Sequence, residues 1–163
     1  MFTRLRLFLF AALCVILIGG CGDDTGTNNP PATTSFMNAT FEGQAWNSTS
    51  ANAVRTQTFN ILNITGSRTT GSGMESIAIT MPGVTTTGTY QIAVGQATGQ
   101  ITTGGILYAM GMELGESYGQ VNITKFGDGR VAGTFSMTVY QEANTANPAK
   151  QVTNGSFDIA LTQ

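Results

Sequence analysis

Nine acidic side chains and no histidine limit the acid–base chemistry that this chain of 163 residues could support. A Ser-His-Asp triad and a Cys-His pair are excluded, because both need an imidazole. A glycosidase needs two carboxylates that face one sugar, and Glu113 and Glu116 are the only acids close in sequence between residues 36 and 163. We interpret them as solubilising acids at a turn. The sequence therefore predicts no catalytic residue, with a carbohydrate-active enzyme as the weaker alternative.

Metal and nucleic-acid binding are also disfavoured. Ordinary zinc sites use cysteine and histidine, and the chain has two cysteines and no histidine. Asp128 stands between two glycines, but one carboxylate is too few to bind Ca²⁺. We interpret Asp128 as a turn-forming residue. Seven basic against nine acidic groups give a net charge of −2, whereas a nucleic-acid binder needs a basic surface. We expect no metal, no cofactor and no nucleic-acid partner.

Aromatic side chains are the remaining candidates for ligand binding. Trp46, Tyr108, Tyr118 and Tyr140 could stack on a sugar or anchor a protein. Tyr140 falls on the polar face of its run by parity, while core packing is the simpler interpretation of Trp46. These four residues are the candidate ligand-binding residues, with a polysaccharide or a protein as the partner.

The N-terminal residues are typical of an export signal. Arg4 and Arg6 precede twelve uncharged residues from Leu7 to Ile18. A helix of that length spans about 18 Å, well short of a hydrocarbon core of ~30 Å. The following Ile18-Gly19-Gly20-Cys21 resembles the lipobox of bacterial lipoproteins. The resemblance implies a signal peptide over residues 1–20 and a lipid on Cys21; a secretory signal with a chance cysteine is the alternative.

Residues 21–35 are expected to form a flexible tether. From Gly22 to Ser35 there is no large apolar residue, so nothing offsets the entropy of ordering. Asp23 and Asp24 resemble the short acidic export signals of surface lipoproteins in some Gram-negative groups, and two solvated acids in a linker are an equal alternative. The expected location is the bacterial cell envelope, at the outer membrane, facing the periplasm or the exterior.

Residues 36–163 are expected to form one domain, whose strands must position these side chains. Hydrophobicity alternates with period two, most clearly from Val131 to Tyr140, where one face is apolar and the other carries hydroxyls. Similar runs are Ile77–Met81, Ile106–Met112, Val121–Ile123 and Phe157–Leu161. A further run starts at Phe59 and continues to Ile64. Its phase changes between Phe59–Ile61 and Leu62–Ile64, which indicates a bulge or a strand buried on both faces.

Turn sequences separate these runs. Gly127-Asp128-Gly129 predicts a tight hairpin, Glu42-Gly43-Gln44 turns the first run toward Trp46, and Ala143–Pro148 reads as a polar loop. Thr70–Gly73 and Pro82-Gly83 bracket the Ile77 run. The predicted fold class is all-β, an antiparallel β-sandwich or a small β-barrel of about 8–10 strands.

Several segments resemble a known group of proteins. Ala39-Thr40-Phe41-Glu42-Gly43-Gln44-Ala45-Trp46 is similar to the A-x-[FI]-x-G-x-x-W opening of small Bacteroidetes-type lipoproteins with domains of unknown function. Three later segments are similar to the closing strands of the same family: Gly119–Thr124, Gly133–Ser136 and Thr153–Phe157. The resemblance implies an exported all-β domain and supplies no catalytic residue.

The sequence thus predicts a membrane-anchored envelope lipoprotein whose β-domain is a non-catalytic binding or structural module. Its partners are the membrane, through Cys21, and an envelope polysaccharide or protein. A lipocalin-like carrier of a small apolar ligand is the alternative. The inward-facing set of the last strands, which includes Phe135 and Met137, is bulky enough to fill a small interior and weakens that alternative.

Overall fold

The computed structural model describes residues 34–163, which form eleven strands and no helix. In chain order the strands are β1 (Phe36–Phe41), β2 (Gln44–Asn47), β3 (Ser50–Thr56), β4 (Ile61–Thr70), β5 (Gly73–Pro82), β6 (Gly88–Gln91), β7 (Thr98–Thr103), β8 (Ile106–Ala109), β9 (Gly119–Gly127), β10 (Arg130–Gln141) and β11 (Lys150–Thr162). The predicted all-β class is confirmed, with eleven strands where about 8–10 were expected.

The predicted signal peptide, Cys21 and the tether up to residue 33 lie outside the described residues. The described strands belong to one compact unit, Thr33–Gln163. Nothing in residues 34–163 is a helix with the length and apolar character needed to cross a bilayer.

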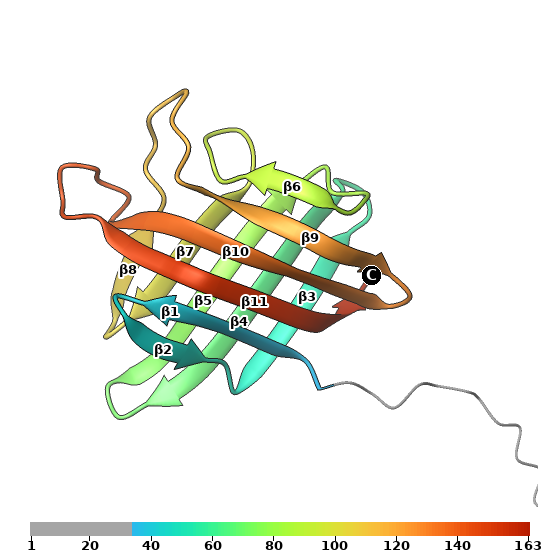
Figure 1. The fold of residues 1–163 in the computed structure, drawn as a ribbon, viewed down its shortest axis with the longest axis horizontal. Helices are drawn as coiled ribbons and strands as arrows, with labels where there is room; N and C mark the ends of the chain where they lie inside the picture. Colours follow the sequence, from blue (N-terminus) through green and yellow to red (C-terminus); the bar gives the residue numbers. More distant parts are fainter. Residues whose placement is uncertain (1–33) are drawn as a thin grey trace, which may run out of the picture. The chain divides into compact units, whose positions relative to one another are not determined.

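The strands form two layers within one hydrogen-bonded sheet, and in Figure 1 the strands of one layer cross over those of the other. Layer A has the order β2-β1-β11-β10-β9-β6, and layer B has the order β3-β4-β5-β7-β8. The layers join at two corners. At one corner β8 pairs with the end of β10, and at the other Leu161 and Thr162 of β11 pair with β3. The fold therefore has the two packed layers of a β-sandwich, and short strand pairings join the layers at two corners, as in a β-barrel.

One corner pairing is parallel, whereas an antiparallel fold was predicted. Leu161 aligns with Ala53 and Thr162 aligns with Val54, so β11 and β3 run in the same direction at this corner. The other ladders between strands are antiparallel. The turn signals predicted hairpins, and hairpins are antiparallel by construction. The parallel contact arises between strands far apart in sequence, so no local turn specifies it.

Three tight hairpins follow from residues that tolerate a left-handed backbone. The two-residue loops Glu42-Gly43, Gly104-Gly105 and Asp128-Gly129 have φ angles of 49° and 76°, 56° and 76°, and 49° and 67°. Positive φ at both central positions is the requirement of the type I′ turn, whose twist matches that of paired strands. The hairpins predicted at Glu42-Gly43 and Asp128-Gly129 are confirmed.

Two predicted runs extend beyond their strands. Phe59 lies in the turn before β4 and is 70% exposed, so the change of phase at Ile61 marks the start of a strand and no bulge. The run from Ile106 to Met112 ends early, because β8 stops at Ala109 and Met112 is 65% exposed in the following loop.

The inner faces of the two layers interlock. A Cβ atom added to Gly66 of β4 would lie 2.9 Å from the Met37 side chain of β1, and one added to Gly99 of β7 would collide with Met137 of β10. The largest fully buried side chains come from both layers: Met37, Trp46, Leu62, Ile64, Ile77, Ile79, Met81, Ile92, Ile101, Ile123, Met137 and Ile159. This packing fills the interior of the described domain and gives no support to the lipocalin-like alternative.

Candidate functional site

The structure separates the four aromatic residues that the sequence suggested for ligand binding. Trp46 is 1% exposed and Tyr118 is 6% exposed, so both are core residues rather than open stacking surfaces. Tyr140 lies on the solvent-facing side of β10, as parity predicted, and its ring meets that of Tyr118 edge-on at 6.1 Å. Tyr108 on β8 is half-buried and its ring lies 6.1 Å from that of Phe41. The four side chains do not form one exposed platform.

Trp46 belongs to a buried cluster that joins β2 to layer B. The Arg68 guanidinium lies 5.4 Å from the centre of the Trp46 ring and donates to the Ala45 carbonyl oxygen at 3.3 Å. Arg68 Nε also donates to the Glu75 carboxylate at 2.7 Å, and Thr103 Oγ1 donates to the same carboxylate at 2.7 Å. Trp46 of the opening motif therefore has a structural role, because its ring packs against the guanidinium of the Arg68–Glu75 ion pair.

The surroundings of Glu75 favour its charged form. Burial alone would raise its pKa, but the hydrogen bonds from Thr103 and Arg68, together with the charge of Arg68, hold the pKa below its ordinary value. The indole N–H of Trp46 adds a weaker interaction of the same sign that falls short of hydrogen-bond geometry. The Glu75 carboxylate therefore serves as the acceptor for Arg68 and Thr103 inside the domain.

Glu113 of the predicted acidic pair is likewise engaged. The Tyr118 and Thr145 hydroxyls both donate to its carboxylate, and its backbone N–H donates to the Tyr118 hydroxyl oxygen at 3.2 Å. The Thr145 and Tyr118 hydrogen bonds lower the pKa of Glu113, while burial raises the pKa of Tyr118. Glu116 is exposed in the same loop. Within residues 34–163 no group of three or more acids could hold a metal ion.

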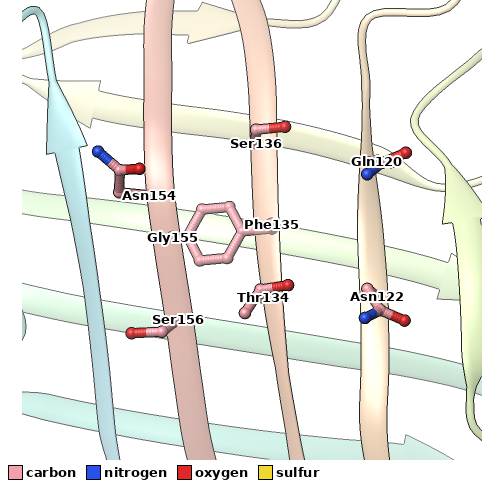
Figure 2. A pocket seen from close by; sticks show the side chains of 8 residues that line it. All are labelled: Gln120, Asn122, Thr134, Phe135, Ser136, Asn154, Gly155 and Ser156. Atoms are coloured by element: carbon pink, nitrogen blue, oxygen red, sulfur yellow. The ribbon is translucent and has the colours of Figure 1, made fainter.

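A hollow of about 330 Å³ opens on the solvent-facing side of layer A. Figure 2 shows its lining on three adjacent strands, with Phe135 of β10 directed toward Gly155 of β11. The eight lining residues are uncharged: Gln120, Asn122, Thr134, Phe135, Ser136, Asn154, Gly155 and Ser156. Its volume falls within the range of small-molecule sites, although the hollow is open to solvent.

A β-bulge in β11 shapes this hollow. Phe135 aligns with Gly155 but Met137 aligns with Val152, so β11 carries one extra residue opposite Ser136. Asn154 lies at this point with a φ of 51°, a left-handed conformation that asparagine adopts at low cost. A Cβ atom on Gly155 would lie 2.5 Å from the Phe135 ring. The missing side chain therefore lets the Phe135 ring pack against β11 on the core side, beneath the polar side chains that line the hollow.

The polar groups around the hollow are free to bind a ligand. Within residues 34–163, five lining side chains form no hydrogen bond: Gln120, Thr134, Ser136, Asn154 and Ser156. Asn122 accepts a long hydrogen bond of 3.4 Å from Thr89 Oγ1. Solvent satisfies such groups at low cost, and a hydroxyl-rich ligand could replace that solvent with direct hydrogen bonds.

The sequence reasoning pointed at aromatic rings and did not single out this hollow. Its lining residues appeared there only within alternating runs and within the segments that resemble the closing strands of a family. The missed signal lies in the three closing segments, because all eight lining residues fall within Gly119–Thr124, Gly133–Ser136 and Thr153–Phe157. Their apolar members face the core, and their polar members meet on the outer face.

Comparison with known proteins identifies a family and no activity. No curated protein and no solved structure matches the chain. One family model matches 33–159, a range that contains the whole hollow, the Trp46 cluster and ten complete strands. The chain accordingly belongs to the family described as Domain of unknown function (DUF6252).

Proposed function

We propose that this protein is a lipid-anchored lipoprotein of the bacterial cell envelope whose β-domain is a non-catalytic binding module. The hollow on layer A carries the binding part of the proposal. Its five uncharged polar side chains without partners in the described domain are the groups best placed to recognise another molecule. The lipid anchor rests on Ile18-Gly19-Gly20-Cys21 and on the short apolar run before it.

The acids of the described domain support a non-catalytic role. Glu75 is buried against Arg68 and Thr103, and Glu113 accepts hydrogen bonds from Tyr118 and Thr145. A general acid in a glycosidase needs a raised pKa, whereas the surroundings of both carboxylates lower theirs. Neither carboxylate lies on the hollow.

The location in the outer membrane extends the same proposal. Two or more acyl chains hold a protein durably at a bilayer, and a tether over residues 21–35 would let the domain stand off the surface. Asp23 and Asp24 support display on the cell exterior. Replacement of Cys21 by alanine should move the protein from the membrane fraction to the soluble fraction or block its processing. Fatty-acid labelling that persists in the Cys21→Ala protein would disprove the anchor.

A blocking substitution tests the binding surface. Thr134 is exposed on β10 at the hollow, so Thr134→Arg should obstruct it with a long charged side chain. Thr98→Arg, at an exposed position of β7 in layer B, is the matched control. We expect the unmodified chain and the control to retain an envelope component in a pull-down, and Thr134→Arg to lose it. Equal retention by all three proteins would show that the hollow is not the binding surface.

A further inference from the structure

The hollow lies within a longer row of uncharged polar residues. Neighbouring positions on the outer face of layer A align across six strands in the order Thr89, Asn122, Thr134, Ser156, Asn38 and Asn47. We call these six residues the amide–hydroxyl row. Each member carries a side-chain amide or hydroxyl, so the row presents donors and acceptors to solvent without a formal charge. Asn122, Thr134, Ser156 and Asn38 each lie between two buried neighbours.

Charged side chains on the strands of layer A lie outside the row. Lys125 on β9 is exposed, aligns with Ala132 and forms no ion pair within residues 34–163, whereas the others form two ion pairs. Arg130 Nε binds the Asp158 carboxylate at 2.7 Å near one end of β10 and β11. Lys150 Nζ binds Glu42 at 3.1 Å near the other end of β11. The field between these two ion pairs is uncharged along the row, so it offers nothing that would select an anionic or a cationic ligand.

Layer B provides an internal comparison. Its outer face is also rich in hydroxyls. There Thr80 Oγ1 donates to Asn63 Oδ1 at 2.8 Å, while the cross-strand pair Ser67 and Ser76 forms no side-chain hydrogen bond within residues 34–163. On layer A, Thr134 and Ser156 are direct cross-strand neighbours and form no side-chain hydrogen bond within residues 34–163. The bulge at Asn154 and the hollow also occur on layer A. Bulges recur beside functional sites because they redirect side chains locally.

We propose that the amide–hydroxyl row binds an uncharged polysaccharide that runs across β9, β10 and β11, with one sugar seated in the hollow. This inference rests on the proposed binding function and names its ligand class. Adjacent strands lie about 4.8 Å apart, close to the length of one pyranose unit, so successive sugars can each meet the polar side chains of a new strand.

The shape of the site favours a chain over a free small molecule. The hollow is open to solvent, and the row extends beyond it on both sides, to Thr89 on β6 and to Asn38 on β1, so polar side chains are available to the units on either side of the seated sugar. A peptide ligand would need apolar pockets for its anchoring side chains, and the lining of the hollow has amides and hydroxyls in their place.

The test uses the full chain in detergent and two panels of soluble polysaccharides. The neutral panel contains dextran, mannan and xylan, and the anionic panel contains polygalacturonate and heparin. Thr134→Ala/Ser156→Ala removes two cross-strand hydroxyls from the hollow, and Ser67→Ala/Ser76→Ala removes two cross-strand hydroxyls from layer B as the matched control. Gln120→Ala, at an exposed position, is a second variant that leaves β10 and β11 unchanged.

We expect binding to at least one neutral polysaccharide, with little dependence on salt because no charge is involved. The hollow variants should bind about tenfold more weakly, and the layer B control should bind as the unmodified chain does. Binding restricted to the anionic panel, absence of binding to the neutral panel, or equal affinity of hollow and control variants would each overturn the inference. Retention of an envelope protein that Thr134→Arg abolishes, without any neutral glycan binding, would overturn the ligand class and keep the binding function.

Discussion

At the scale of single residues, Glu75 links three strands of layer B and the edge strand β2. Its side chain is 9% exposed and accepts hydrogen bonds from Arg68 and Thr103. Glu75→Gln keeps the shape but removes the charge that both donors face, so we expect the free energy of unfolding to fall by about 2 kcal/mol. Chemical denaturation at neutral pH measures the loss. Glu116→Gln, at an exposed loop position, is the control and should leave stability unchanged.

The same carboxylate gives stability a defined pH dependence. The pKa of Glu75 is lower in the folded protein than its ordinary value of 4.5. Its contribution is therefore fully present above the unfolded-state pKa, and it is lost as the pH falls through the folded-state pKa. The unmodified protein should lose more stability on acidification below about pH 4.5 than Glu75→Gln does. Parallel pH dependences in the two proteins would contradict the assignment.

Tyr118 should titrate at a higher pH than a free tyrosine does. Burial raises the pKa of its hydroxyl, and the hydrogen bond that it donates to the Glu113 carboxylate raises it further. A titration followed by ultraviolet absorbance should therefore contain a late step that belongs to Tyr118. Tyr118→Phe should remove the late step. Tyr108→Phe is the control, and loss of the late step in that variant alone would refute the prediction.

At the scale of strands, Gly133 marks a close approach of β9 to β10. A Cβ atom there would collide with the Asn122 backbone carbonyl oxygen and lie 2.9 Å from the Phe157 ring. Backbone cannot move aside as a flexible side chain can, so Gly133→Ala should lower the free energy of unfolding by about 2–3 kcal/mol. Thermal or urea unfolding measures the effect. Gly71→Ala meets no atom within 4 Å and should change stability by less than about 0.5 kcal/mol; equal effects would show that the strands can separate there.

Strand prediction succeeded where large apolar residues alternate and failed where small residues face the core. Val131 to Tyr140 became β10 with the expected inner and outer faces. No run was predicted over β3 or β7, because their buried positions include Ala53 and Gly99, which give only a faint hydrophobic pattern. These small residues make room for side chains of layer A, as Met137 over Gly99 shows. The information lies in the packing between layers and cannot be read from one strand.

The candidate site shows a similar limit of sequence reasoning. Parity placed Ser136 and Tyr140 correctly on the outer face of layer A. The hollow also needs Gly155, which aligns with Phe135, and Asn154, which the bulge of β11 brings opposite Ser136. The extra residue changes the phase of β11 relative to β10, and a bulge in a Thr-Asn-Gly-Ser segment is indistinguishable from a turn in the sequence alone.

At the scale of the whole described domain, the two corners decide how the layers unfold. β10 and β11 pair with each other in layer A, and each also pairs at one end with a strand of layer B. Neither layer can therefore separate without breaking hydrogen bonds at both corners and exposing the shared core. This connectivity favours one cooperative transition in place of stepwise loss of the layers.

The last prediction follows from that closure: residues 34–163 should fold alone, without a metal ion or a disulfide. Both cysteines, Cys14 and Cys21, precede this segment, and the segment contains no histidine. Its core draws on both layers, and its compact unit begins at Thr33, so the fragment keeps nearly all of the contacts that stabilise it. We expect a circular dichroism spectrum of β-structure and a single thermal transition. Neither a chelator nor a reducing agent should shift its midpoint, because no metal or disulfide contributes to stability. A helical spectrum, two separate transitions, or unfolding on addition of the chelator would contradict this account, and the full chain measured alongside shows whether residues 1–33 alter the midpoint.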